Sequence, residues 1–123
     1  MTSRKVAVLI GSLRAESYSR KLASALIGLA PAALTLEVVE IGDLPLYNED
    51  LDAGTPPAAY TAFREKMKGF DAFLFVTPEY NRSMPAVLKN ALDVGSRPYG
   101  HSIWDGKPGA VISVSIGGIG GFG

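Results

Sequence analysis

The segment at residues 11–20 combines hydroxyl groups and a fixed positive charge directly after an apolar run. Ser12, Ser17 and Ser19 supply hydroxyl donors, and Arg14 carries a fork of donors suited to phosphate oxygens. The segment holds one glycine and therefore lacks the spacing of the common dinucleotide and nucleotide loops. If it also leads into a helix, it predicts a monophosphate site. The alternative is that a serine caps that helix and Arg14 is solvated.

Residues 77–85 form the most specific segment of the chain, because two prolines stiffen it around a polar and aromatic centre. Its backbone amides and Asn81 can bond the edge of a heterocycle, and Tyr80 offers an aromatic wall. The segment predicts a site for a flat polar ring such as isoalloxazine. The alternatives are a salt bridge or a capping role for Glu79, a packed surface ring for Tyr80 and a solvated charge for Arg82.

The last segment, residues 113–123, begins with two serines and continues with five glycines. Glycines remove the side-chain wall and let the backbone approach a ligand closely. The competing interpretation is a flexible artefact of truncation. His101 and Trp104 lie in an earlier loop without a second titratable partner nearby, so a packing or interface role is expected for both. No side chain is assigned a catalytic role, and no metal site is predicted.

The elements that position these segments follow from hydrophobic periodicity. Apolar runs at 5–10, 72–77 and 109–115 predict strands buried in a parallel sheet, whereas the partial alternation at 34–41 predicts an edge strand. Helical spacing predicts three helices: one over residues 19–30 with a stripe of leucines, one after Pro57 with Tyr60, Phe63, Met67 and Phe70 on one face, and one beginning at Pro85.

Strands that alternate with helices indicate an α/β fold, doubly wound around a parallel sheet with helices on both faces, in one domain spanning residues 1–123. Ligands of such sheets bind beyond the carboxyl ends of the strands. The three chemistry-bearing segments all follow predicted strands. We therefore expect them to meet at one edge of the sheet.

Composition excludes several functions. Twelve basic and twelve acidic residues balance, so neither nucleic acid nor an anionic membrane surface is an expected partner. The chain has no cysteine and one histidine, so redox chemistry requires a bound cofactor. The apolar run at residues 6–10 is too short for a signal sequence or a membrane span, which predicts a cytoplasmic protein.

The combination of segments resembles the NADPH-dependent FMN reductase family, in the branch that includes chromate, quinone and azo-dye reductases. The residues that carry the resemblance are 11–14, 17–20, 78–83, 88–93 and 115–121. The resemblance implies a flavodoxin-like sheet with strand order 2-1-3-4-5 and FMN as cofactor. It also implies a homodimer or homotetramer with the flavin near an interface.

Residue by residue, the resemblance assigns the FMN phosphate to the first segment and the isoalloxazine ring to the second, with the third close to both. The cofactor-binding residues it implies are Ser12, Arg14, Ser17, Ser19, Pro78, Glu79, Tyr80, Asn81, Arg82, Ser115 and Gly117. The sequence departs from many relatives at Ser19, where they carry Asn, and at Ile116, where they carry Pro. Relatives also continue further, so the fifth strand and last helices are expected to be absent from this chain.

The function implied is an NAD(P)H-dependent, FMN-containing oxidoreductase. NADPH or NADH would supply electrons, and a small molecule such as a quinone, an azo compound, chromate or free flavin would accept them. One alternative is a non-enzymatic electron carrier of the flavodoxin type, which the balanced charge disfavours because such carriers are usually acidic. Another is a nonfunctional truncated fragment.

Overall fold

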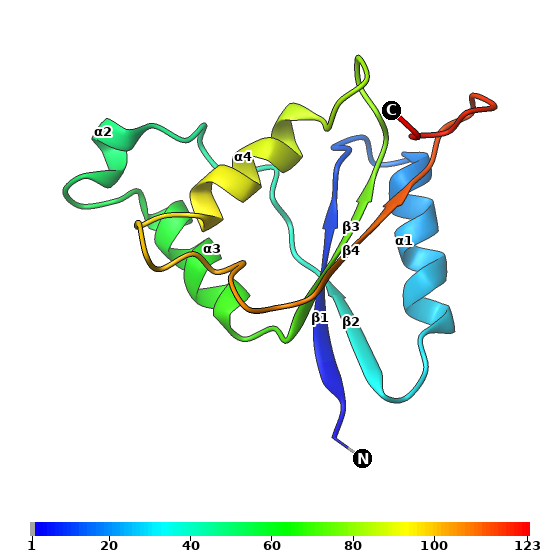
Figure 1. The fold of residues 1–123 in the computed structure, drawn as a ribbon, viewed down its shortest axis with the longest axis horizontal. Helices are drawn as coiled ribbons and strands as arrows, with labels where there is room; N and C mark the ends of the chain where they lie inside the picture. Colours follow the sequence, from blue (N-terminus) through cyan, green and yellow to red (C-terminus); the bar gives the residue numbers. More distant parts are fainter. Residues whose placement is uncertain (1) are drawn as a thin grey trace.

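The computed structural model describes residues 2–123 as a parallel four-stranded sheet with helices on both faces (Figure 1). The strand order is β2-β1-β3-β4. This confirms the predicted doubly wound α/β fold and the order 2-1-3-4. The strands are β1 (Arg4–Ile10), β2 (Leu34–Val38), β3 (Ala72–Thr77) and β4 (Gly109–Ser113).

β1 is one of the two inner strands of the sheet and pairs in parallel with β2 and β3. Val6 lies opposite Leu36 of β2 and Ala72 of β3, and Ile10 lies opposite Val76. β2 is an edge strand, as its alternation predicts, but it ends at Val38 rather than at residue 41. The carboxyl ends of β1, β3 and β4 lie at one edge of the sheet (Figure 1).

Helix α1 covers one face of the sheet, and α3 and α4 cover the other (Figure 1). A short helix, α2, interrupts the segment at 44–57 that the sequence predicts to be a loop. Within residues 2–123, every helix is too short or too polar to cross a membrane. The helices are α1 (Tyr18–Leu29), α2 (Glu49–Asp52), α3 (Ala58–Lys68) and α4 (Ala86–Gly95).

The side chains on the two faces of β1 pack into two separate hydrophobic cores. Val8 and Ile10 pack with α1, whereas Ala7 and Leu9 pack with α3 and α4. The core under α1 is small and does not reach the end of that helix. Leu29, predicted to lie on the buried stripe, is therefore 80% exposed.

The core under α3 and α4 is larger and aromatic. The predicted face of α3 is buried, including Phe63 and Met67. Trp104 packs edge-on against Phe73 with ring centroids 4.8 Å apart, and its indole N–H donates to the carbonyl oxygen of Leu92 at 3.1 Å. The packing role predicted for Trp104 is confirmed, whereas His101 is exposed.

A buried ion pair attaches α2 to α3 and α4. Arg64 donates two hydrogen bonds to the carboxylate of Asp52, at 2.9 and 2.8 Å, and its Nε donates to the carbonyl oxygen of Val94 at 2.9 Å. The two charged side chains are only 8% and 7% exposed. The Tyr47 hydroxyl also donates to Asp52, and burial raises the pKa of Tyr47. Every group of this cluster is thereby held in one geometry.

We predict that Asp52→Asn lowers the free energy of unfolding at pH 7 by about 3 kcal/mol, because it leaves the buried Arg64 charge without a counterion. Hydrogen bonds from Arg64 hold the pKa of Asp52 below its ordinary value. The stabilisation from the ionised Asp52 carboxylate is therefore complete above its unfolded-state pKa of about 3.9. It is lost as the pH falls through the folded-state pKa of Asp52. Urea unfolding at pH 7 and pH 3 measures both effects.

The matched control is Asp50→Asn, since Asp50 belongs to the same short helix and is exposed. It should change the free energy of unfolding by less than about 0.5 kcal/mol. Equal losses in the two variants would show that the buried pair contributes nothing of its own.

Gly11 closes β1 at the point where its loop begins and lies against Thr77 of β3. The Gly11 amide donates to the carbonyl oxygen of Val76 at 2.9 Å. A Cβ at position 11 would overlap the Thr77 hydroxyl and lie 2.8 Å from the Thr77 Cβ. The close approach of the two strand ends therefore requires glycine at this position.

Accordingly, Gly11→Ala should lower the free energy of unfolding by about 1–3 kcal/mol through overpacking. Gly28→Ala in α1 serves as the control, because a Cβ there meets nothing within 4 Å. That helical substitution should raise stability by about 0.5–1 kcal/mol. Urea unfolding of both variants checks the opposite signs, and a shift in the same direction for both would contradict the argument.

Candidate functional site

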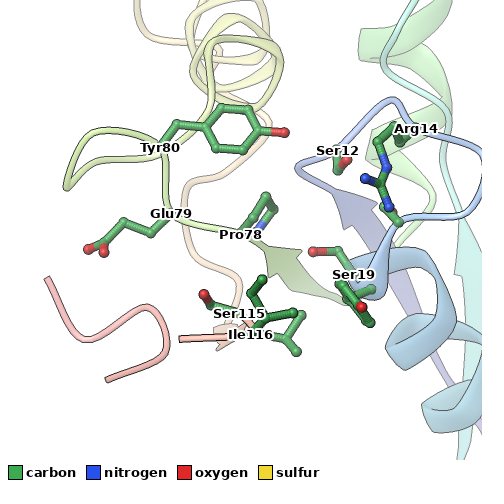
Figure 2. A pocket seen from close by; sticks show the side chains of 11 residues that line it. Ser12, Arg14, Ser19, Pro78, Glu79, Tyr80, Ser115 and Ile116 are labelled. Atoms are coloured by element: carbon green, nitrogen blue, oxygen red, sulfur yellow. The ribbon is translucent and has the colours of Figure 1, made fainter. Parts of the chain in front are cut away.

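The three chemistry-bearing segments enclose a cleft of about 250 Å³ beyond the carboxyl ends of β1, β3 and β4 (Figure 2). The predicted meeting of the segments is therefore observed. The residues that line the cleft are Ser12, Arg14, Ser17, Tyr18, Ser19, Pro78, Glu79, Tyr80, Val114, Ser115 and Ile116.

The start of α1 forms one end of the cleft. Ser17 is the N-cap residue, and its hydroxyl oxygen accepts a hydrogen bond from the Arg20 amide at 3.0 Å. This leaves the amides of Tyr18 and Ser19 without an intrahelical acceptor, at the positive end of the helix dipole. The capping role that the sequence left open for Ser17 thus exists, and it orients the remaining donors of the helix start.

Two serine hydroxyl groups line the cleft beside these amides. Ser12 is 5% exposed and Ser19 is 2% exposed, and neither hydroxyl forms a hydrogen bond within residues 2–123. Both hydroxyl groups are therefore free to bond a ligand in the cleft. The donor set suits an anion.

Arg14 supplies the positive charge of this end. Its side chain is exposed, and Nη2 donates to the carbonyl oxygen of Glu16 at 3.3 Å. No carboxylate of residues 2–123 forms a salt bridge with it. The guanidinium charge remains available to an anion at the start of α1.

Pro78, Glu79 and Tyr80 form the second wall. Figure 2 shows the Tyr80 ring extending toward Ser12 across the cleft, whereas the Glu79 carboxylate points away from Ser12 and Arg14. The Glu79 Oε1 atom is buried and has no hydrogen-bond partner within residues 2–123. Pro78 and Tyr80 therefore present apolar surface to the cleft, which suits a flat ring.

Beyond Tyr80 the chain reverses direction in a tight turn. The backbone amides and carbonyls of Tyr80 and Ser83 bond each other at 2.9 and 3.0 Å, and Asn81 and Arg82 between them adopt left-handed φ values of 53° and 63°. This is the geometry of a type I′ turn, in which Asn is favoured. Asn81 and Arg82 consequently lie exposed at the tip and do not line the cleft.

The third segment contributes side chains rather than glycine backbone. Ser115 and Ile116 line the cleft, whereas Gly117 does not and instead donates its amide to the Ser115 hydroxyl at 3.0 Å. The lining also includes Tyr18 and Val114, which the sequence analysis did not select. The position of Tyr18 between two serines at the predicted helix start was the available signal.

The arrangement can hold a ligand with an anionic end at α1 and a flat ring between Tyr80 and Ser115. Ser12, Arg14 and Ser19 supply polar donors, and Pro78, Tyr80 and Ile116 supply apolar surface.

A family model described as NADPH-dependent FMN reductase matches residues 4–123. A quinone reductase from Pseudomonas putida is 67% identical over 118 residues, covering 96% of this chain and 63% of the relative. A 2-hydroxy-1,4-benzoquinone reductase from Burkholderia sp is 54% identical over 116 residues, covering 94% and 63%.

Among solved structures, the flavoenzyme FerB, an NAD(P)H:(acceptor) oxidoreductase from Paracoccus denitrificans, superposes with a TM-score of 0.88 at 46% identity. The match covers 94% of this chain and 63% of that structure. The chain thus spans a little under two thirds of the length of these relatives. Because the family model matches almost every residue of the chain, the protein belongs to the NADPH-dependent FMN reductase family.

Proposed function

We propose that the protein binds FMN in the cleft and passes electrons from NADPH or NADH to a small acceptor. The acceptor classes are quinones, azo compounds, chromate and free flavin. The observation that carries this proposal is the convergence of an anion-binding helix start and an aromatic wall in one cleft. Relatives described as quinone reductases and the FerB flavoenzyme support the same reading.

The phosphate of FMN would lie at the start of α1. The hydroxyls of Ser12 and Ser19 line the cleft there without a hydrogen bond to the rest of residues 2–123, and the Arg14 charge is nearby. A phosphate dianion would accept hydrogen bonds from these donors. Ser17 holds the helix start in the conformation that presents its amides.

The isoalloxazine ring would lie between Pro78, Tyr80 and the third segment. Pro78 lacks an N–H and stiffens the backbone, and the Tyr80 ring offers a face for stacking. Ser115 contributes a hydroxyl group at the opposite wall. Asn81, Arg82 and Gly117 do not line the cleft. We therefore propose that they shape the cofactor site through their backbone conformation.

FMN held in the cleft would supply two-electron chemistry between the reduced nicotinamide and the acceptor. The residues of the chain bind the cofactor, orient its ring and leave one face open. The cleft requires no dedicated acid or base for these tasks. Tyr80, 50% exposed, marks the open side.

The first test is the visible absorption spectrum of the purified protein after FMN is added and the excess removed. We expect a retained flavin spectrum, and NAD(P)H should bleach it. Arg14→Ala should then weaken FMN binding by about tenfold or more, because a charge-assisted contact is worth about 1.5–3 kcal/mol. Riboflavin, which lacks the phosphate, should bind the variant as it binds the unaltered protein.

The control is Arg97→Ala, which removes the same charge from a loop outside the cleft. It should leave the dissociation constants of both flavins unchanged. Equal losses of FMN and riboflavin binding in Arg14→Ala would place the phosphate elsewhere. A protein that retains no flavin at all would refute the proposal for this chain.

We further propose that the protein is a cytoplasmic homodimer or homotetramer. Apolar side chains at or next to the cleft are exposed, including Leu13 at 61% and Ile116 at 84%, as expected of a surface that a second copy covers. The first apolar run of the chain is the inner strand β1, which supports a cytoplasmic location over a targeting role for that run. Light scattering of protein purified from the cytosolic fraction should give two or four times the 13.0 kDa chain mass. The mass of a single chain would contradict the assembly.

A further inference from the structure

β2 is an edge strand whose outward backbone groups have no partner. The order β2-β1-β3-β4 gives β2 a single neighbour. The Val39 amide and the Ala33 carbonyl oxygen both bond to β1. Because backbone groups alternate in direction along a strand, the N–H and C=O groups of Leu36 and Val38 point away from β1, where no strand of residues 2–123 meets them. This edge therefore offers a row of alternating hydrogen-bond donors and acceptors.

A cavity of about 300 Å³ lies beside this edge, between α3 and the segment at residues 38–44. Its most buried lining side chains are Val39, 3% exposed, and Phe63, 6% exposed, which give it an apolar floor. Ala59 and Ala62 line it from α3, and their short side chains leave room above that floor. The cavity shares no lining residue with the cleft, so a ligand here is independent of the proposed cofactor.

The lining of this cavity includes one carboxylate without an ion pair. Of the three charged lining residues, Glu40 pairs with Arg20 at 3.2 Å. Lys66 pairs with Glu37, also at 3.2 Å. Asp43 is exposed and forms neither a salt bridge nor a hydrogen bond within residues 2–123. The charge left over is negative, so it favours a basic group in a ligand and disfavours a carboxylate or a phosphate.

We propose that the edge of β2 and the cavity beside it bind an extended segment of a partner protein. The segment pairs with β2 as an additional strand, places an apolar side chain in the cavity and brings a lysine or arginine next to Asp43. In such recognition the main-chain hydrogen bonds supply affinity, and pockets for alternate side chains supply specificity. Residues two apart in a strand point to the same face, so the apolar and the basic residue alternate with residues that face away from α3.

β4 is the opposite edge strand and is the competing place for an added strand. A cavity of about 280 Å³ beside it is lined by Val111 and Ser113 of β4. That lining also contains both the guanidinium of Arg82 and the carboxylate of Glu79, so its charges balance without a ligand. A basic side chain therefore gains more from the cavity beside β2.

The proposal can be tested with a short peptide that has blocked ends, in which threonines alternate with valine, valine and lysine. Backbone amide signals in NMR spectra are followed as the peptide is added to the whole chain. We expect saturable shifts at Leu36, Val38 and Ala62. No saturable shift, or shifts confined to β4, would overturn the proposal. Glutamate in place of the lysine should weaken binding about fivefold, because it turns an attraction to Asp43 into a repulsion.

Methylated peptides test whether the peptide pairs as a strand. A methyl group on the backbone nitrogen of every second residue removes the donors along one edge of the peptide and keeps those along the other. Two such forms exist, one methylated at the threonines and one at the valines and lysine. One form should lose binding and the other should keep it, because only one edge of the peptide faces β2. Equal affinities of the two forms would overturn strand addition.

Two matched pairs of variants test the cavity and its charge. Ala62 and Ala25 are both exposed alanines within helices, but only Ala62 lines the cavity. Ala62→Phe should fill the cavity and weaken peptide binding about tenfold or more, whereas Ala25→Phe should leave it unchanged. Asp43→Asn should weaken binding of the lysine peptide about two- to fivefold, as an exposed ion pair does, and Asp105→Asn, in an exposed loop outside the cavity, should not. Equal affinities within either pair would overturn the proposal.

Discussion

The parallel pairing of β1 with both β2 and β3 is the constraint on which the rest of the structure depends. β1 is buried on both faces over its last five residues, so its side chains pack alternately into two hydrophobic cores. Parallel pairing in turn puts every strand's carboxyl end at the same edge. Gly11 lets β1 and β3 end in close contact there, and the cleft opens directly beyond them.

The polar groups of this fold divide into two kinds. Asn90 of α4 is fully engaged: its Oδ1 accepts from the Tyr47 amide at 2.7 Å, and its Nδ2 donates to the carbonyls of Leu44 and Pro45. Arg64 and Asp52 are likewise satisfied. By contrast, the hydroxyl groups of Ser12 and Ser19 and the buried Glu79 Oε1 have no partner in residues 2–123. These three residues all line the cleft.

The sequence predicts most of the fold because its signals are local, but it does not predict what packing decides. Three apolar runs and one partial alternation locate the four strands, although β4, predicted to be buried over residues 109–115, is a mostly exposed edge strand that ends at Ser113. The short helix α2 is missed because its four residues carry no apolar period and begin from an Asn48 cap. The sequence predicts the cleft, because the three chemistry-bearing segments all follow strands. It does not predict the exposed position of Asn81, because that position depends on backbone pairing between Tyr80 and Ser83.

One short turn shapes one wall of the proposed cofactor cleft. Asn81 and Arg82 take up the reversal at left-handed φ angles, and Tyr80 directly before the turn lines the cleft. The same reversal returns the chain to Pro85, the N-cap residue of α4. A backbone conformation that costs on the order of 1 kcal/mol for a residue such as Arg82 persists only where the surroundings impose it. Here the paired backbones of Tyr80 and Ser83 impose it, and the turn thereby holds one aromatic ring at the wall of the proposed flavin site.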